Sequence, residues 1–203
     1  LGRLTVYDYY LDFDQSVPGI SSNSLGVRFA GDHGFSDDFS LLYQVEFANQ
    51  RDIGDNPTDL NENYYLADVG VRVSKVDVRL AVESLGGNGT SSLQTPLATL
   101  HAHNGWADRF LVTPVEGLMD YYLLVGGPVG KKWKWSARLH DFNSDTGGLH
   151  YGSELDLLAS YKVVEGGLIG LKMAFYSGDD ASASNPLTAF DTTKAWLWMR
   201  YTW

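Results

Sequence analysis

The stretch FSLLYQVEF, residues 39–47, alternates between two kinds of side chain. Its odd-numbered positions are all apolar or aromatic, whereas Ser40, Gln44 and Glu46 occupy even-numbered positions. Successive side chains of a β-strand point to opposite faces of the sheet, so this period of two predicts a strand with one apolar and one polar face. Residues 76–83 and 132–140 repeat the pattern. An alternating strand is therefore the building unit that we expect for the whole chain.

Strand and turn signals along the rest of the chain predict about ten such strands. They cover residues 3–13, 23–31, 38–49, 63–74, 75–85, 117–126, 131–142, 149–163, 167–177 and 194–203. Most are near the roughly 9–11 residues that a tilted strand needs to cross a bilayer. We therefore predict an all-β fold, a transmembrane antiparallel up-and-down β-barrel that forms a single domain over residues 1–203.

The predicted connections alternate between long and short. The long ones are residues 14–22, 50–62, 86–116, 143–148 and 178–193, and the short ones are 32–37, 74–75, 127–130 and 164–167. Outer-membrane barrels have short periplasmic turns and longer extracellular loops, whereas a soluble sandwich gives no reason to sort loops in this way. This pattern predicts that the protein lies in the bacterial outer membrane of a Gram-negative cell, with both termini on the periplasmic side.

Aromatic side chains of the apolar faces gather near the predicted strand ends. The periplasmic group is Phe29, Phe39, Trp133, Trp135, Tyr161, Tyr201 and Trp203, and the outer group is Phe13, Phe47, Tyr65, Tyr121, Tyr151 and Phe175. Such rings favour the headgroup region, so two girdles in contact with outer-membrane lipid and lipopolysaccharide are expected. Every backbone polar group in hydrocarbon must be paired, and the first strand should therefore pair with the last unless additional sequence supplies further strands.

Composition excludes several other classes of protein. The 203 residues are 44% hydrophobic and 13% aromatic, which is incompatible with a disordered chain. No apolar run approaches the roughly 18 residues of a transmembrane helix. The chain has no cysteine, which excludes a disulfide framework. Its net charge of −10 argues against nucleic acid as a partner, because phosphate binding needs basic surfaces.

Three stretches resemble known outer-membrane proteins. The last strand, AWLWMRYTW at 195–203, is similar to the C-terminal strand that such proteins present to the barrel-assembly machinery. The segments YYLDFD at 9–14 with SNSLGVRF at 22–29, and QTPLATL at 94–100 through NGWADRF at 104–110, resemble the alginate export family of channels. This resemblance implies an outer-membrane channel. Family members are about twice as long, so the chain matches only their C-terminal half. Three alternatives are open: a fragment that lacks an N-terminal half, a processed half, and a natural small relative that closes at about ten strands.

The longest predicted loop, residues 86–116, is too apolar for a solvated loop. It contains Leu93, Leu97, Leu100, Trp106, Phe110 and Leu111. We expect it to fold into or over the barrel mouth as a constriction, the alternative being a loop held over the rim by its own apolar cluster. His101, His103, Asp108 and Arg109 would then be its polar contribution to the pore. The two histidines lack a third ligand at characteristic spacing, so no metal and no cofactor is predicted.

Charged side chains of both signs are predicted on the inward faces. The pore candidates among them are Glu46, Arg79, Glu83, Lys134 and Arg138, and Asp8 and Tyr10 are also expected to point inward. These residues favour a channel or porin-like protein for small polar solutes or saccharides. A non-conducting barrel that serves as a structural anchor or a partner-binding module is the alternative. His140, Asp141 and His150 flank an outer loop as in omptin-like proteases, but no nucleophile motif accompanies them, so no enzyme is predicted.

Overall fold

The computed structural model describes residues 2–13, 18–98, 101 and 103–203, and it is almost entirely β-structure. The strands are β1 (Arg3–Leu11), β2 (Ser22–Ser36), β3 (Phe39–Asp52), β4 (Asn61–Val73), β5 (Val76–Leu85), β6 (Leu118–Val129), β7 (Trp133–Asn143), β8 (His150–Val164), β9 (Gly167–Gly178) and β10 (Thr192–Tyr201). Two short 3-10 helices, η1 (Pro18–Ile20) and η3 (Pro186–Ala189), lie in connections. Neither they nor any other described helix is long and apolar enough to cross a membrane.

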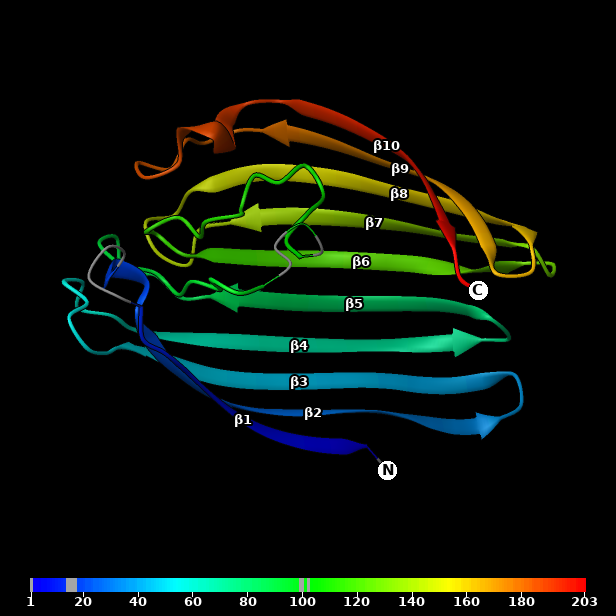
Figure 1. The fold of residues 1–203 in the computed structure, drawn as a ribbon, viewed down its shortest axis with the longest axis horizontal. Helices are drawn as coiled ribbons and strands as arrows, with labels where there is room; N and C mark the ends of the chain where they lie inside the picture. The colour runs from blue at the N-terminus through cyan, green and yellow to red at the C-terminus, as the bar shows by residue number, and fades with distance from the viewer. Residues whose placement is uncertain (1, 14–17, 99–100, 102) are drawn as a thin grey trace.

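The ten strands form one sheet in chain order, and each strand pairs antiparallel with the next. Figure 1 shows them side by side, with the N- and C-termini at the same end of the sheet. The predicted ten-stranded, up-and-down, antiparallel arrangement is therefore confirmed. Within the described residues the ladders join consecutive strands, which leaves β1 and β10 as the two edges of the sheet.

The connections differ in length at the two ends of the sheet. The end that carries the termini, called the turn end, has the short connections 37–38, 74–75, 130–132 and 165–166. The opposite loop end has the connections 12–21, 53–60, 86–117, 144–149 and 179–191. The turn expected at 32–37 is shorter in the structure, because β2 continues to Ser36 and pairs there with Phe39. Gly130 and Gly166 have φ of 61° and 74°, a left-handed conformation that suits tight turns.

Period-two alternation gives the sheet an apolar face and a polar face. The apolar face carries aliphatic side chains such as Val45, Val69, Leu80 and Leu139, which are all exposed. Exposure is highest on the edge strand β10, where Leu197 is 84% exposed. Hydrophobic surface of this extent is not found on ordinary soluble domains unless something covers it. The polar face carries most of the charged side chains of the strands and is where the 86–117 segment lies.

The buried core lies on the polar face at the loop end. It consists of Leu85, Leu93, Ala107, Phe110, Leu118, Phe142, Tyr151, Ala174 and Tyr176. Phe110 of the 86–117 segment lies 4.6 Å from the ring of Phe142 and 5.6 Å from that of Tyr151, measured between centroids. Burial of these rings supplies much of the free energy that orders the long segment. Leu97 and Leu111 of the same segment are exposed, and Leu100 lies outside the described residues.

Tyr151 does not belong to the outer aromatic girdle, so that expectation was wrong. Its side chain is fully buried, and its hydroxyl donates to the Gly117 carbonyl at 3.0 Å. The ladder between β7 and β8 shifts register at Phe142 and Asn143, and Gly152 beside it has φ of 136°. This irregularity breaks the alternation of β8 and turns Tyr151 toward the polar face.

The face assignment of β1 also differs from the expectation. Asp8 pairs with Leu25, and Tyr10 pairs with Asn23, which places both on the apolar side of the sheet instead of inward. Tyr7 is on the polar face instead, where its hydroxyl donates to Glu46 at 2.8 Å. Polar and aromatic residues occur on both faces of β1, so the period of two carries little information there.

Candidate functional site

The 86–117 segment crosses the polar face from β3 to β10. Gln50 of β3 binds its first limb through a reciprocal pair of hydrogen bonds with the main chain of Gln94, both 2.8 Å long. At the other side of the sheet Arg109 donates to the hydroxyl of Thr192 on β10. Figure 1 shows the segment as the green trace in front of β6 to β8. Contacts with widely separated strands therefore fix the segment against the polar face of the sheet.

Two buried carboxylates of β8 hold the middle of the segment. Glu154 accepts a hydrogen bond from the Ala107 N–H at 2.8 Å, and Asp156 accepts one from the Trp106 N–H at 3.2 Å. Gly105, which directly precedes the two donors Trp106 and Ala107, has φ of 83°. A Cβ atom at residue 105 would lie 2.6 Å from the Glu154 carboxylate. The backbone approaches the sheet this closely because residue 105 has no side chain.

A buried histidine lies beneath this contact. His140 of β7 has its Nδ1 atom 2.7 Å from Asp120 of β6, and its Nε2 atom lies 3.7 Å from Asp156. The segment reaches this group through Asn104, whose amide donates to Asp120 at 3.5 Å and to the neighbouring Glu83 at 3.0 Å. Sequence reasoning did not pair His140 with Asp120. The alternation of β6 and β7 could have indicated this contact, because it places Asp120 and His140 on the same face of two neighbouring strands.

A second charged group lies nearer to β9 and β10. His101 Nδ1 is 2.5 Å from Asp108, Lys194 donates to the same carboxylate at 2.7 Å, and Lys172 donates to His101 Nε2 at 2.8 Å. Because Nε2 accepts, Nδ1 carries the proton and donates to Asp108. Burial acts to raise the pKa of Asp108, but the hydrogen bonds from Lys194 and His101 outweigh it and lower this pKa. Lys172 also lies 4.2 Å from the centre of the Trp106 ring.

A cavity of about 510 Å³ lies on the other side of the segment, against β1 to β5. We call it the chamber. Its sheet side is formed by Tyr7, Tyr9, Leu11, Ser24, Glu46, Ala48, Gln50, Tyr64, Glu83 and Leu85, and its segment side by residues 93–98, His103, Asn104 and Phe110. Tyr64 donates to Glu83 at 2.6 Å, as Tyr7 does to Glu46. Its volume is within the range of small-molecule sites.

The predicted pore residues separate into groups. His103, Glu46 and Glu83 line the chamber, whereas His101, Asp108 and Arg109 lie in the part of the segment that contacts β9 and β10. The remaining three are on the polar face outside both groups. Arg79 pairs with Asp68 at 2.9 Å, Arg138 lies 5.1 Å from the Tyr122 ring centre, and Lys134 is exposed on β7 near the turn end. Sequence reasoning missed Tyr7, Tyr9 and Tyr64 as chamber residues.

The residues predicted for the periplasmic girdle lie near the turn end. Phe29, Phe39, Trp133, Trp135, Tyr161 and Tyr201 are on strands there, and Trp203 follows β10. The Trp133 and Tyr161 rings contact each other across β7 and β8, with centroids 4.8 Å apart. Trp203 is fully exposed.

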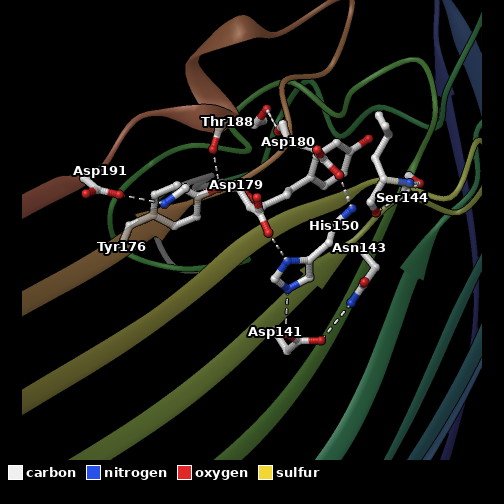
Figure 2. Close-up of polar contacts among 12 residues, drawn as sticks. Asp141, Asn143, Ser144, His150, Tyr176, Asp179, Asp180, Thr188 and Asp191 are labelled. Carbon is white, nitrogen blue, oxygen red and sulfur yellow. Dashed lines mark hydrogen bonds and ion pairs between the residues drawn. The ribbon is translucent and has the colours of Figure 1, made fainter.

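The three residues weighed for protease chemistry do not converge. His140 is buried on the polar face, whereas Asp141 next to it points to the opposite face. Figure 2 shows His150 between Asp141 and Asp179, with ring nitrogens 2.9 and 3.0 Å from their carboxylates. This group is exposed at the loop end. Among the residues that the structure describes, no cluster of three or more His, Cys, Asp or Glu has a geometry suited to a metal ion.

Comparison with known protein families finds no family model that matches the chain. Comparison with curated proteins also finds no significant match. The resemblance to the alginate export family therefore rests on the two sequence segments alone.

Proposed function

We propose that this protein is an outer-membrane β-barrel channel that passes small polar solutes, narrowed by the 86–117 segment. The observation that carries the proposal is the position of this segment. It lies on the charged face of the sheet, is hydrogen-bonded to β3, β5, β8 and β10, and borders a chamber of about 510 Å³. A segment held across the interior of a barrel sets what can pass.

The apolar face supports the membrane location. Its aliphatic side chains are exposed on every part of the sheet, and short turns are sorted to the end that carries both termini. Lipid and lipopolysaccharide would cover this face. In a bilayer β1 and β10 would also have to pair, because an open sheet edge in hydrocarbon leaves backbone N–H and C=O groups without hydrogen-bond partners. The C-terminal strand β10 is the part that we expect the barrel-assembly machinery to recognise.

A non-conducting barrel is the second candidate, and the buried contacts that hold the segment in place favour it. The buried carboxylates of Glu154 and Asp156 and the core around Phe110 hold the segment as a plug would be held. Such a barrel would serve as an anchor or as a partner-binding module. The two candidates differ in ion conductance. A channel conducts ions past the segment and conducts more once the segment is removed, whereas an anchor conducts in neither form.

Conductance in planar bilayers tests the proposal. The full chain is compared with a variant in which residues 93–112 are replaced by a short Gly-Ser linker. We expect small conductance steps from the full chain and larger steps from the variant, because the strands remain and the constriction is removed. A matched control shortens residues 54–58, part of a loop-end connection that does not line the chamber, and keeps Asp59, whose carbonyl accepts from Ser91 of the segment; it should leave the steps unchanged. Folded protein that gives no steps in either form overturns the channel and supports the anchor.

A further inference from the structure

We propose that the chamber selects cationic solutes over anionic ones of the same size. This inference rests on the proposed function for its physiological meaning, but the binding itself can be tested without conduction. It comes from three independent features of the chamber: its carboxylates, its tyrosine rings and the placement of the basic residues.

The charged side chains that line the chamber are carboxylates. Glu46 of β3 and Glu83 of β5 both face it, and each accepts a hydrogen bond from a tyrosine hydroxyl of a neighbouring strand. Carboxylate oxygens that line a site favour a cation and repel an anion. Arg28 of β2 lies 3.7 Å from Glu46 and offsets part of its charge, but it does not line the chamber.

The aromatic side chains act in the same direction. Tyr7, Tyr9 and Tyr64 line the sheet side, and the Tyr7 and Tyr9 rings are 5.0 Å apart between centroids. Tyr9 is 58% exposed, so its ring is open to a ligand. The face of an aromatic ring carries partial negative charge and attracts an ammonium or guanidinium group. Apolar C–H groups of a sugar or alkyl chain pack on the same rings.

The basic side chains of the site lie across the segment from the chamber. Lys172 and Lys194 contact His101 and Asp108, toward β9 and β10, and Arg109 reaches Thr192 there. None of the chamber's lining residues in the described parts of the chain is Lys or Arg, and His103 is the one basic side chain among them. The 86–117 segment thus lies between the acidic, aromatic chamber and the basic side chains of Lys172, Lys194 and Arg109. The chamber is suited to an amine-bearing solute such as an amino sugar.

Three probes of the same ring size and different charge test this inference. Glucosamine is cationic, glucose is neutral and glucuronate is anionic at neutral pH. Binding of each to the folded full chain in detergent micelles is measured by ligand-observed NMR and calorimetry. We expect glucosamine to bind most tightly, glucose less tightly, and glucuronate at least about tenfold more weakly than glucosamine. Equal affinities, or tighter binding of glucuronate, would overturn the proposal.

Variants locate the binding. Glu46→Gln and Glu83→Gln keep the shape and an acceptor for the tyrosine hydroxyl, and each should reduce the preference for glucosamine over glucuronate. Tyr9→Leu removes the exposed ring and should weaken glucosamine binding. The control Glu165→Gln removes one negative charge from the β8–β9 turn, far from the chamber, and should change nothing. An equal effect of Glu165→Gln would show that only net charge matters and would refute the assignment. Charge-selective binding by protein that gives no conductance steps would uphold the chamber and refute the channel.

Discussion

Glu154 is one of the two buried β8 side chains that hold the 86–117 segment against the polar face. It is 2% exposed, and its carboxylate accepts from the Ala107 N–H at 2.8 Å. Glu154→Ala would leave that N–H buried without a partner, at a cost of about 1–3 kcal/mol. We expect lower stability toward denaturant in lipid vesicles, faster amide exchange at Ala107, and a larger or noisier conductance.

The matched control at this position is Glu154→Gln, which keeps an oxygen able to accept from Ala107. It should retain slow exchange at that amide while it removes the charge. Unchanged exchange in Glu154→Ala would mean that the core around Phe110, and not this carboxylate, holds the segment.

Glu116 joins two loop-end connections through its carboxylate. Its carboxylate accepts from the Ser182 hydroxyl at 2.7 Å and from the Ala183 N–H at 3.2 Å. Burial acts to raise the pKa of Glu116, but these hydrogen bonds outweigh it, and the pKa lies below the ordinary value of 4.5. A depressed pKa contributes stability that is fully present above the ordinary value and is lost as the pH falls through the lowered one.

We therefore expect the link between residues 86–117 and 179–191 to weaken when the pH falls below 4.5, the ordinary glutamate value. Melting temperatures of the wild type and of Glu116→Gln, measured from pH 7 down to pH 3, check this. The difference between the two proteins should be largest at neutral pH and should shrink in acid. A constant difference across this range would count against a role for the Glu116 charge.

At the scale of the strand, the two faces should respond differently to a new charge. Leu80 lies on the apolar face of β5, paired with Val69 and Leu123, whereas Ser136 lies on the polar face of β7. Leu80→Arg should destabilise the barrel by about 2–4 kcal/mol if the residue lies near the bilayer centre. Ser136→Arg should be tolerated. Reversible unfolding in lipid vesicles measures both, and equal losses of stability would contradict the assignment of the apolar face to lipid.

The sequence predicted strands well wherever one face is uniformly apolar. The ten strands and the sorting of connections follow from the alternation seen in residues 39–47 and from turn residues. Prediction of side-chain direction from the sequence failed where the alternation of a strand is weak or interrupted. In β1, Asp8 breaks an apolar row, and in β8 the irregularity at Gly152 reverses the direction of Tyr151.

The site was predictable only in part, for a different physical reason. Glu46 and Glu83 were named because charge on an inward strand face is visible in the sequence, and His103 was named as a polar residue of the long apolar loop. Tyr64 and Asn104 belong to the same chamber, but they meet only because the 86–117 segment folds back onto β5. The path of a segment of this length is set by tertiary contacts such as the Gln50–Gln94 pair, which join residues far apart in the chain. No local pattern contains them.

At the scale of the whole molecule, the two edges of the sheet decide whether it can exist in a membrane. β1 and β10 each lack a second neighbour among the described ladders, and their apolar-face side chains Val6 and Leu197 are 68% and 84% exposed. In hydrocarbon an unpaired edge is too costly to persist, so we predict that β1 pairs antiparallel with β10 once the protein is inserted. Up-and-down order with ten strands makes this pairing antiparallel.

Cysteine cross-linking tests whether β1 and β10 pair. Because the sequence contains no cysteine, only the introduced pairs can form disulfides. Val6→Cys is combined in turn with cysteine at Ala195, Leu197 or Met199, which lie on the same face of β10. At least one pair should form an intramolecular disulfide under oxidation, because neighbouring strands bring facing side chains within reach of that bond. Cysteines at Leu80 and Leu123, which pair directly between β5 and β6, are the positive control. If the control links in inserted protein and none of the three edge pairs does, β1 and β10 are not neighbours, and other strands must complete the wall.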